Sequence, residues 1–301
     1  MPLYNLGALE WELICPPNLS SFATKNSLQC KENYFKNGNR MSLLKKAKQF
    51  VSENIDPMFH QRRLEGLESL RLDHVLRRKN PYLFKAKNLI NAEDLVKSLV
   101  DAYLSSQEET VFGAFLEQLA IFCSTETVGG RKSGIDGIDL EFERDGVLHL
   151  IAIKSGPNWH NASQLAKLRA DFLKAKRTLN TNSARRNVRF VNGCSYGRIS
   201  KDYGDFEKIC GEAFWTLISN EKNLFTDIVE PLGFEAKKHN DAFELKYGLV
   251  RTKFTAEFIS KYCDENFAID WERIVRFNSG TLATKAMKPP RVKKLLANKK
   301  L

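Results

Sequence analysis

The sequence lacks the short motifs that mark several common classes of protein. Its six cysteines include no Cys-x-x-Cys pair, and no histidine lies at metal-ligand spacing from them, which argues against a zinc finger and favours reduced thiols. A Walker loop and a GxGxxG turn are both missing, which argues against nucleotide-driven translocation. The first residues lack the pattern of a secretory signal, and no run reaches the roughly 18 apolar residues of a membrane span. We therefore expect a cytoplasmic protein with no membrane partner.

Acidic residues are scarce relative to basic ones. The 301 residues include 47 Lys and Arg against 36 Asp and Glu, and the net charge of +11 favours a polyanionic partner, either nucleic acid or an acidic membrane. The tail from Thr281 to Leu301 contains seven basic residues and no acidic one. Two interpretations of the tail stay open: a solubilising segment, and an arm that contacts phosphates.

The distribution of periodic patterns predicts one α/β core between helical regions. Residues 1–40 hold no sustained periodicity, and the helical pattern begins at Met41, which is an alternative start of the protein. The predicted division is a poorly structured N-terminal extension, a helical N-terminal region, an α/β core, a helical C-terminal region and a basic tail, over residues 1–40, 41–105, 106–200, 201–280 and 281–301.

The elements expected outside the central hairpin include helices over 92–105, 108–123 and 161–179, a strand over 187–192, and a largely helical stretch over 205–275.

One of these predicted helices carries a carboxylate among apolar residues. The helix over 108–123 is apolar on nearly every face and should be buried. Glu117 lies in it, and a buried carboxylate is unfavourable unless it meets a cation, a metal or hydrogen-bond donors. Glu117 is therefore a candidate functional residue, with a solvent-facing position as the alternative.

The alternation of residues 138–154 predicts a β-hairpin. IDLEFE and VLHLIAIK alternate with period two on either side of an Asp-Gly turn. A two-residue turn places Asp139 opposite Ala152, so that Asp139, Ala152 and Lys154 share one face. The other face is expected to pack against the core through Ile138, Leu140, Phe142, Val147, Ile151 and Ile153.

Glu117, Asp139 and Lys154 are the residue types that phosphodiester hydrolysis uses. Carboxylates hold a metal that polarises the phosphate and lowers the pKa of a bound water, and a cation orients that water and offsets charge in the transition state. A lone Asp and Lys on a hairpin are a weak signal, because solvent faces of strands often carry such charges. The Ser155-Gly156 pair that follows strengthens the signal, because glycine allows a ligand to approach the backbone closely.

Several longer strings carry a resemblance to a known family. GIDLEFERDGVLHLIAIKSGPNWHNASQ, VNGCSYGR and IDWERIVRFNS resemble the PmeII-like type II restriction endonucleases, which are variants of the PD-(D/E)XK nuclease superfamily, and the resemblance covers about residues 41–279. It implies an α/β fold with a restriction-endonuclease-like core, in which a mixed four-stranded sheet is flanked by helices, and additional N- and C-terminal helices. It also implies Mg²⁺-dependent, sequence-specific cleavage of double-stranded DNA, a homodimer, and a cognate DNA methyltransferase that protects the host DNA.

The resemblance assigns roles to individual residues. Asp139 matches the motif aspartate, Lys154 the motif lysine, and Glu117 the acid that many superfamily members supply from the helix before the hairpin. The position two residues before the lysine is acidic in the superfamily pattern, but here it is Ala152, which cannot bind a metal. We therefore expect Glu117 or Glu141 to join Asp139 as a metal ligand.

The segment after the hairpin supplies the candidate DNA contacts. They are polar, aromatic or basic residues, namely Trp159, Asn161, Gln164, Lys176, Arg177, Arg185 and Arg186. Gln164 also resembles a glutamine that some branches place near the metal, and a solvated basic face is the alternative for the Lys and Arg residues. Asp136 is an alternative to Asp139, although the hairpin register favours Asp139. His149 is interpreted as a packing histidine, and residues 192–198 as part of a DNA cleft or a dimer contact.

Two other functions remain open from the sequence. One is a repair or recombination nuclease that recognises DNA structure rather than sequence. The other is a catalytically inactive DNA-binding protein, and the missing acid at Ala152 motivates it.

Overall fold

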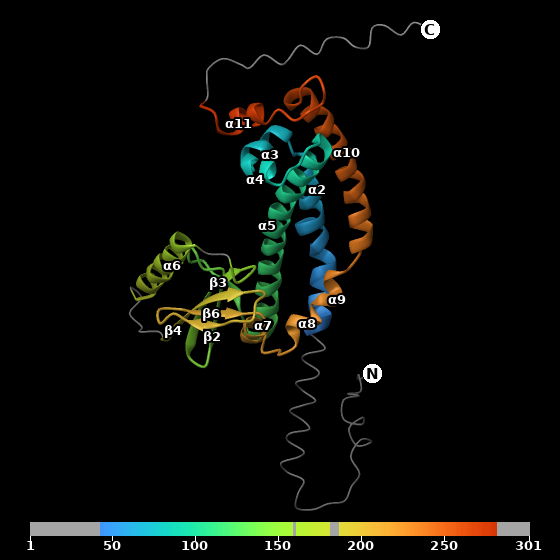
Figure 1. Ribbon diagram of the computed structural model, residues 1–301. Helices are drawn as coiled ribbons and strands as arrows, with labels where there is room; N and C mark the ends of the chain where they lie inside the picture. Colours follow the sequence, from blue (N-terminus) through green and yellow to red (C-terminus); the bar gives the residue numbers. More distant parts are fainter. Residues whose placement is uncertain (1–42, 159–160, 181–186, 282–301) are drawn as a thin grey trace, which may run out of the picture. The chain divides into compact units, whose positions relative to one another are not determined.

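The computed structural model describes residues 43–158, 161–180 and 187–281. The extension predicted over residues 1–40 and the basic tail from residue 282 onward lie outside the described residues. The chain divides into two units, Met1–Lys45 and Lys46–Leu301, and the following description concerns the second. That unit contains a group of helices and a β-sheet flanked by helices (Figure 1). Each part has a cluster of buried apolar side chains.

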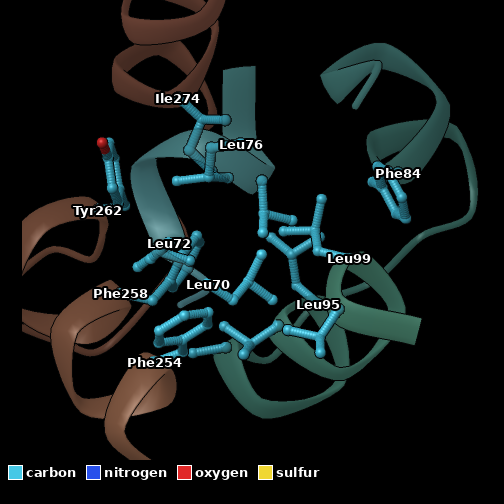
Figure 2. Packing of buried hydrophobic residues seen from close by; sticks show 14 of the residues in the cluster. Leu70, Leu72, Leu76, Phe84, Leu95, Leu99, Phe254, Phe258, Tyr262 and Ile274 are labelled. Atoms are coloured by element: carbon cyan, nitrogen blue, oxygen red, sulfur yellow. The ribbon is translucent and has the colours of Figure 1, made fainter. Parts of the chain in front are cut away.

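The helical core joins segments from both ends of this unit. Residues 46–55 are helical, and the elements that follow are the π-helical turn η1 (Asp56–His60), α2 (Gln61–Glu68), α3 (Leu72–Arg78), α4 (Pro81–Ala86), α5 (Ala92–Val128), α10 (Ala236–Tyr262) and α11 (Trp271–Ser279). Leu72 of α3 and Leu95 and Leu99 of α5 belong to the same buried cluster as Phe254 and Phe258 of α10 (Figure 2). Helices that precede and follow the sheet in sequence therefore share one apolar core, and burial of these side chains stabilises it.

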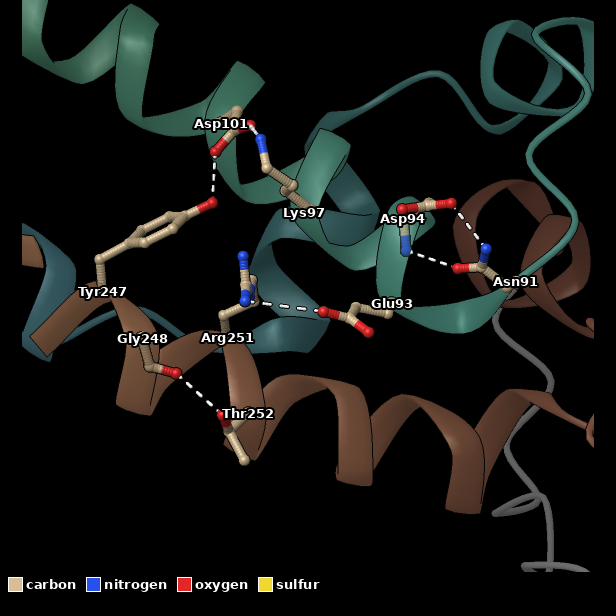
Figure 3. Close-up of polar contacts among 9 residues, drawn as sticks. All are labelled: Asn91, Glu93, Asp94, Lys97, Asp101, Tyr247, Gly248, Arg251 and Thr252. Atoms are coloured by element: carbon tan, nitrogen blue, oxygen red, sulfur yellow. Dashed lines mark hydrogen bonds and ion pairs between the residues drawn. The ribbon is translucent and has the colours of Figure 1, made fainter. Parts of the chain in front are cut away.

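Polar contacts also join α5 to α10. The side chain of Asn91 caps the start of α5 by accepting a hydrogen bond from a backbone N–H of the first turn. Tyr247 of α10 donates a hydrogen bond to Asp101 at 2.6 Å, and Arg251 pairs with Glu93 at 3.6 Å (Figure 3). The Tyr247–Asp101 and Arg251–Glu93 contacts thus link α5 to α10 beside the apolar core.

The helix α5 is a single helix of 37 residues, whereas the sequence predicted two. The predicted break near Ser105-Ser106 is wrong, because Ser106 stays helical and its hydroxyl donates to the carbonyl oxygen of Ala102 at 3.1 Å. The helix ends at Gly129, whose φ of 69° is the left-handed conformation typical of a helix C-terminus. By length and composition α5 could cross a membrane, but buried core helices pass the same test.

A mixed sheet forms the centre of the α/β part. Its strands are β1 (Arg131–Lys132), β2 (Leu140–Arg144), β3 (Val147–Lys154), β4 (Asn187–Cys194), β5 (Lys201–Asp202) and β6 (Glu207–Cys210), in the order β1-β2-β3-β4-β6-β5. The pairs β3–β4 and β4–β6 are parallel, and the other pairs are antiparallel. This confirms the predicted α/β fold with a mixed sheet. The two strands beyond the four implied by the resemblance are the two-residue edge strands β1 and β5.

Helices cover both faces of the sheet. The helix α6 (Ala162–Asn180) packs on one face, and α7 (Glu212–Ser219) lies against the other, where Phe214 closes over Gly193 and Ile151. The short helices α8 (Leu224–Asp227) and α9 (Val229–Leu232) follow. The stretch over 205–275 was expected to be largely helical, but it begins with the strand β6. Four residues are too few for the alternation that distinguishes a strand from a helix.

Both faces of the hairpin are buried, which corrects the expectation of a single core face. Leu148, Leu150 and Ala152 pack with α6 in one cluster. Ile138 belongs to this cluster as well and not to the opposite face, where the sequence placed it. The reason is local: Ile138 precedes β2 in a turn in which its N–H donates to the carbonyl oxygen of Ile135 at 3.0 Å, so the regular alternation has not yet begun.

Candidate active site at the end of the hairpin

The hairpin has the predicted register. The observed Cα pairs are Leu140–Ile151, Glu141–Leu150, Phe142–His149, Glu143–Leu148 and Arg144–Val147. Asp145 and Gly146 have φ angles of 53° and 72°, and two residues with positive φ are what a two-residue type I′ turn requires. The turn therefore sets the register that brings Asp139 beside the end of β3.

Asp139 is held at this position by hydrogen bonds with the backbone of β3. Its N–H donates to the carbonyl oxygen of Ile151 at 2.9 Å, and its carboxylate accepts from the N–H of Ile153 at 2.6 Å. Burial raises the pKa of the Asp139 carboxyl, while the hydrogen bond from Ile153 and the charges of Lys154 and Lys132 oppose that rise. The carboxylate is thus oriented by the backbone of β3 and lies within electrostatic range of two lysines.

Glu117 approaches the same place from α5. Its side chain is half-buried, and the pKa of its carboxyl is raised first by burial and then by the charge of Asp139. Lys132 and Lys154 oppose the rise. The structure therefore brings Glu117, Asp139 and Lys154 together, as the sequence predicted for a catalytic centre, although their catalytic role stays a prediction. Within the described ranges, no group of three or more His, Cys, Asp or Glu side chains is placed to hold a metal.

Lys154 ends β3 in a region where two loops are locked together. The carbonyl oxygen of Lys154 accepts a hydrogen bond from the N–H of Ser195 at 3.0 Å, and that of Ser155 accepts from Tyr196 at 3.3 Å. A Cβ added to Gly156 would lie 2.3 Å from the Tyr196 ring. Gly156 therefore accommodates Tyr196 rather than a ligand, which corrects the interpretation of this glycine. The contacts fix the backbone that carries Lys154.

Lys132 is a residue of this site that the sequence analysis missed. It lies in the edge strand β1, where its Cα pairs with Leu140, the residue next to Asp139. Its charge lowers the pKa of both Glu117 and Asp139. A two-residue strand has no detectable period, so only the basic Arg131-Lys132 pair close to the hairpin could have drawn attention to it.

Two other predicted acids are directed elsewhere. Glu141, a predicted metal ligand, lies on β2, and its carboxylate is bound at 2.7 Å both by Arg131 and by the hydroxyl of Ser133. Asp136, the alternative to Asp139, is exposed and pairs with Lys174 at 3.2 Å. The structure therefore draws neither acid into the pair formed by Glu117 and Asp139.

Those of the residues predicted to contact DNA that fall within the described ranges lie on α6 or at its start. Asn161 and Gln164 cap the helix reciprocally: the N–H of Asn161 donates to the Gln164 side chain at 2.9 Å, and the N–H of Gln164 donates to the Asn161 side chain at 3.0 Å. Lys176 and Arg177 are exposed on the same helix. Trp159, Arg185 and Arg186 lie outside the described residues.

His149 has the surroundings of a packing residue. It is buried, its ring stacks on Phe142 with centroids 4.6 Å apart, and its Nδ1 lies 3.1 Å from the carbonyl oxygen of Val147. Burial is the main cause that lowers the pKa of the His149 imidazole. A buried, stacked imidazole agrees with the predicted packing role.

A mixed sheet flanked by helices, with two carboxylates and a lysine at the end of its central hairpin, defines the restriction-endonuclease-like class of nuclease fold. The family model described as type II restriction endonuclease EcoO109I matches residues 45–240, which is about two thirds of the chain. The protein therefore belongs to this family of type II restriction endonucleases. No curated protein matches the chain.

Proposed function

We propose that this restriction endonuclease hydrolyses double-stranded DNA at a specific sequence in a Mg²⁺-dependent reaction, and that it belongs to the PmeII-like branch. The observation that carries the proposal is the convergence of Glu117, from α5, and Asp139, which directly precedes β2, beside Lys154. Two half-buried carboxylates, one of which raises the pKa of the other, are an arrangement that catalytic sites use.

The two carboxylates fit a divalent cation. Burial and mutual repulsion raise the pKa of Glu117, and burial raises that of Asp139, so their ionised forms lack full compensation from the protein. Glu117 and Asp139 would hold Mg²⁺ through oxygen atoms, and water and substrate oxygens would complete its shell. When bound, the metal supplies Lewis acidity at the phosphate and lowers the pKa of a bound water.

The protein side chains then have separate tasks. The N–H of Ile153 keeps the Asp139 carboxylate in one orientation, so that little reorganisation is needed when substrate binds. Lys154 orients the attacking water and offsets the charge that develops on the phosphate in the transition state. Lys132, from the opposite side of Asp139, adds positive charge at the same place.

The expected partners follow from the substrate. Two strands of a duplex are cut most simply by two copies of one active site, so we propose a homodimer whose symmetry matches the symmetry of its DNA site. Lys176, Arg177 and Asn161 are proposed to contact the DNA backbone, together with Trp159, Gln164, Arg185 and Arg186. A cognate DNA methyltransferase would protect the host DNA in the cytoplasm, where we expect both proteins.

Digestion of a large unmethylated DNA tests the proposal. Wild-type protein should produce discrete fragments with Mg²⁺ and none with EDTA, and Lys154→Ala and Asp139→Ala should leave the DNA intact. Asp136→Ala is the matched control, because this exposed aspartate pairs with Lys174 and should not be needed for cleavage. Loss of cutting in the Asp136 variant, with retention in the Asp139 variant, would move the metal site to Asp136.

A second function is supported by one observation. Ala152 is 1% exposed and packs in the apolar cluster under α6, so the motif position has been absorbed into the core. A DNA-binding protein without nuclease activity would show this feature. Tight DNA binding with no metal-dependent cleavage would establish that function, whereas cleavage restricted to flaps or junctions would indicate a structure-specific nuclease.

A further inference from the structure

The residue opposite Ala152 on the neighbouring strand is polar. Ala152 of β3 pairs with Asn192 of β4, and in paired parallel strands the two side chains project from the same face of the sheet. Lys154 projects from that face two residues further along β3. The position that lacks its motif acid therefore has an amide side chain one strand away.

Asn192 is buried without a partner for its oxygen. Its side chain is 1% exposed, and its Oδ1 has no hydrogen bond with any of the described residues. Phe190, two residues earlier on the same face, packs in the apolar cluster under α6. An unpaired buried carbonyl oxygen costs free energy of folding, and this calls for an explanation other than packing.

The lysine paired with Asn192 on the next strand does not satisfy this oxygen. Lys208 of β6 pairs with Asn192 on its other side, but the Lys208 ammonium donates to the carbonyl oxygen of Pro157 at 2.6 Å. Lys208 thus holds in place the loop that follows Lys154. The Asn192 oxygen remains an acceptor one strand away from the position where the motif acid would otherwise lie.

We propose that the amide oxygen of Asn192 takes the place of the missing motif acid by accepting a hydrogen bond from a water ligand of the active-site Mg²⁺. The inference rests on the proposed metal-dependent function and deepens it. Amide oxygens suit the hydrated shell that Mg²⁺ retains in proteins. A neutral oxygen also avoids adding a third negative charge to Glu117 and Asp139, which already repel each other.

Asn192→Leu separates this role from a structural one. Leucine has a similar size and removes both polar atoms of the amide. If Asn192 assists metal binding, the variant should bind Mn²⁺ about 10- to 100-fold more weakly, as loss of an outer-shell partner does. It should unfold at the same or a higher urea concentration, because an unpaired buried oxygen has been removed. A residue needed only for the fold would show lower stability and unchanged metal affinity.

Two further variants sharpen the test. Thr216→Val removes another buried oxygen that has no partner among the described residues, on α7, and it should leave Mn²⁺ affinity unchanged. Asn192→Ala combined with Ala152→Asp moves the oxygen back to the motif position. This double variant should recover most of the affinity that Asn192→Ala alone loses.

The experiment uses full-length protein and two readouts. Mn²⁺ binding is followed by electron paramagnetic resonance without DNA, and the Mn²⁺ concentration for half-maximal cleavage is measured on plasmid DNA. Equal values for wild type and Asn192→Leu in both readouts would overturn the inference while leaving the nuclease intact. A wild-type protein that neither binds Mn²⁺ nor cuts DNA would overturn the proposed function itself.

Discussion

The two halves of α5 lie in different chemical surroundings. In the first half, Leu95 and Leu99 pack into the helical core, and the polar residue Asp101 is paired with Tyr247 of α10. In the second half, Glu117 is within electrostatic range of Asp139, and burial raises the pKa of both carboxyls. One continuous helix thus carries a region in which Asp101 is paired and a region in which the charge of the carboxylates is only partly compensated by Lys132 and Lys154.

This difference shows how stability and activity are separated within the molecule. The helical core supplies favourable burial, and the sheet end holds charges that destabilise the metal-free protein. Because the helix is continuous, the core also fixes the position of Glu117. We expect substitutions in the first region to lower the free energy of unfolding and to leave the chemical step of cleavage unchanged. Substitutions in the second region should slow cleavage without lowering the stability of the metal-free protein.

Truncation in the helical core should have the largest effect. Phe258 of α10 is fully buried, and Phe258→Ala should lower the free energy of unfolding by about 3–5 kcal/mol, because it removes apolar burial and leaves a cavity. Urea unfolding measures the change. Leu249→Ala on the same helix is the control, since Leu249 is 62% exposed and its loss should change stability by less than about 0.5 kcal/mol. Equal losses in the two variants would show that this core is not tightly packed.

Removal of the Glu117 charge should reduce the cleavage rate without reducing stability. Glu117→Gln keeps the size of the side chain and abolishes its repulsion with Asp139, so stability without metal should be unchanged or higher. The cleavage rate should fall by more than about a hundredfold, because a metal ligand is lost. Rates at saturating Mg²⁺ and urea unfolding of the same preparation measure the two effects. A destabilised but fully active variant would make Glu117 a packing residue.

Lys132 should have an intermediate effect on cleavage. Its charge acts on both carboxylates from an exposed edge strand, where solvent weakens the interaction, so Lys132→Met should slow cleavage by about three- to tenfold. Lys201→Met is the matched control, since Lys201 lies in the two-residue strand at the opposite edge of the sheet. If both variants lose the same activity, the effect reflects general attraction of DNA.

The predictable part of the site is the part governed by local sequence. Alternation and the Asp145-Gly146 turn determined the hairpin register, and this register placed Asp139 correctly beside the end of β3. The apolar pattern around Glu117 likewise indicated a buried helix. Such signals are contained within a few adjacent residues, so one sequence is enough to read them.

The missed part depends on partners distant in the chain. Lys132 joins the site through a two-residue strand, and Asn192 faces Ala152 only because β4 pairs in parallel with β3 after an intervening helix. The continuity of α5 across Ser105-Ser106 is decided by packing on both halves, against a modest local helix propensity. Pairing between distant strands and packing between helices depend on residues far apart in the chain, so they cannot be predicted from a local sequence pattern.

The pH dependence of stability should show the smallest effect. The carboxyls of Glu117 and Asp139 have raised pKa values relative to the ordinary 4.5 and 3.8, so the folded protein binds these protons more tightly than the unfolded chain does. Metal-free stability should therefore fall as pH rises from below the ordinary values through the raised ones. Mg²⁺ should restore stability only above this range, because its ligands must be ionised. Urea unfolding across pH, with Mg²⁺ and with EDTA, measures both trends. In Glu117→Gln the EDTA curve should flatten, and an unchanged slope would assign the dependence to carboxyls elsewhere in the protein.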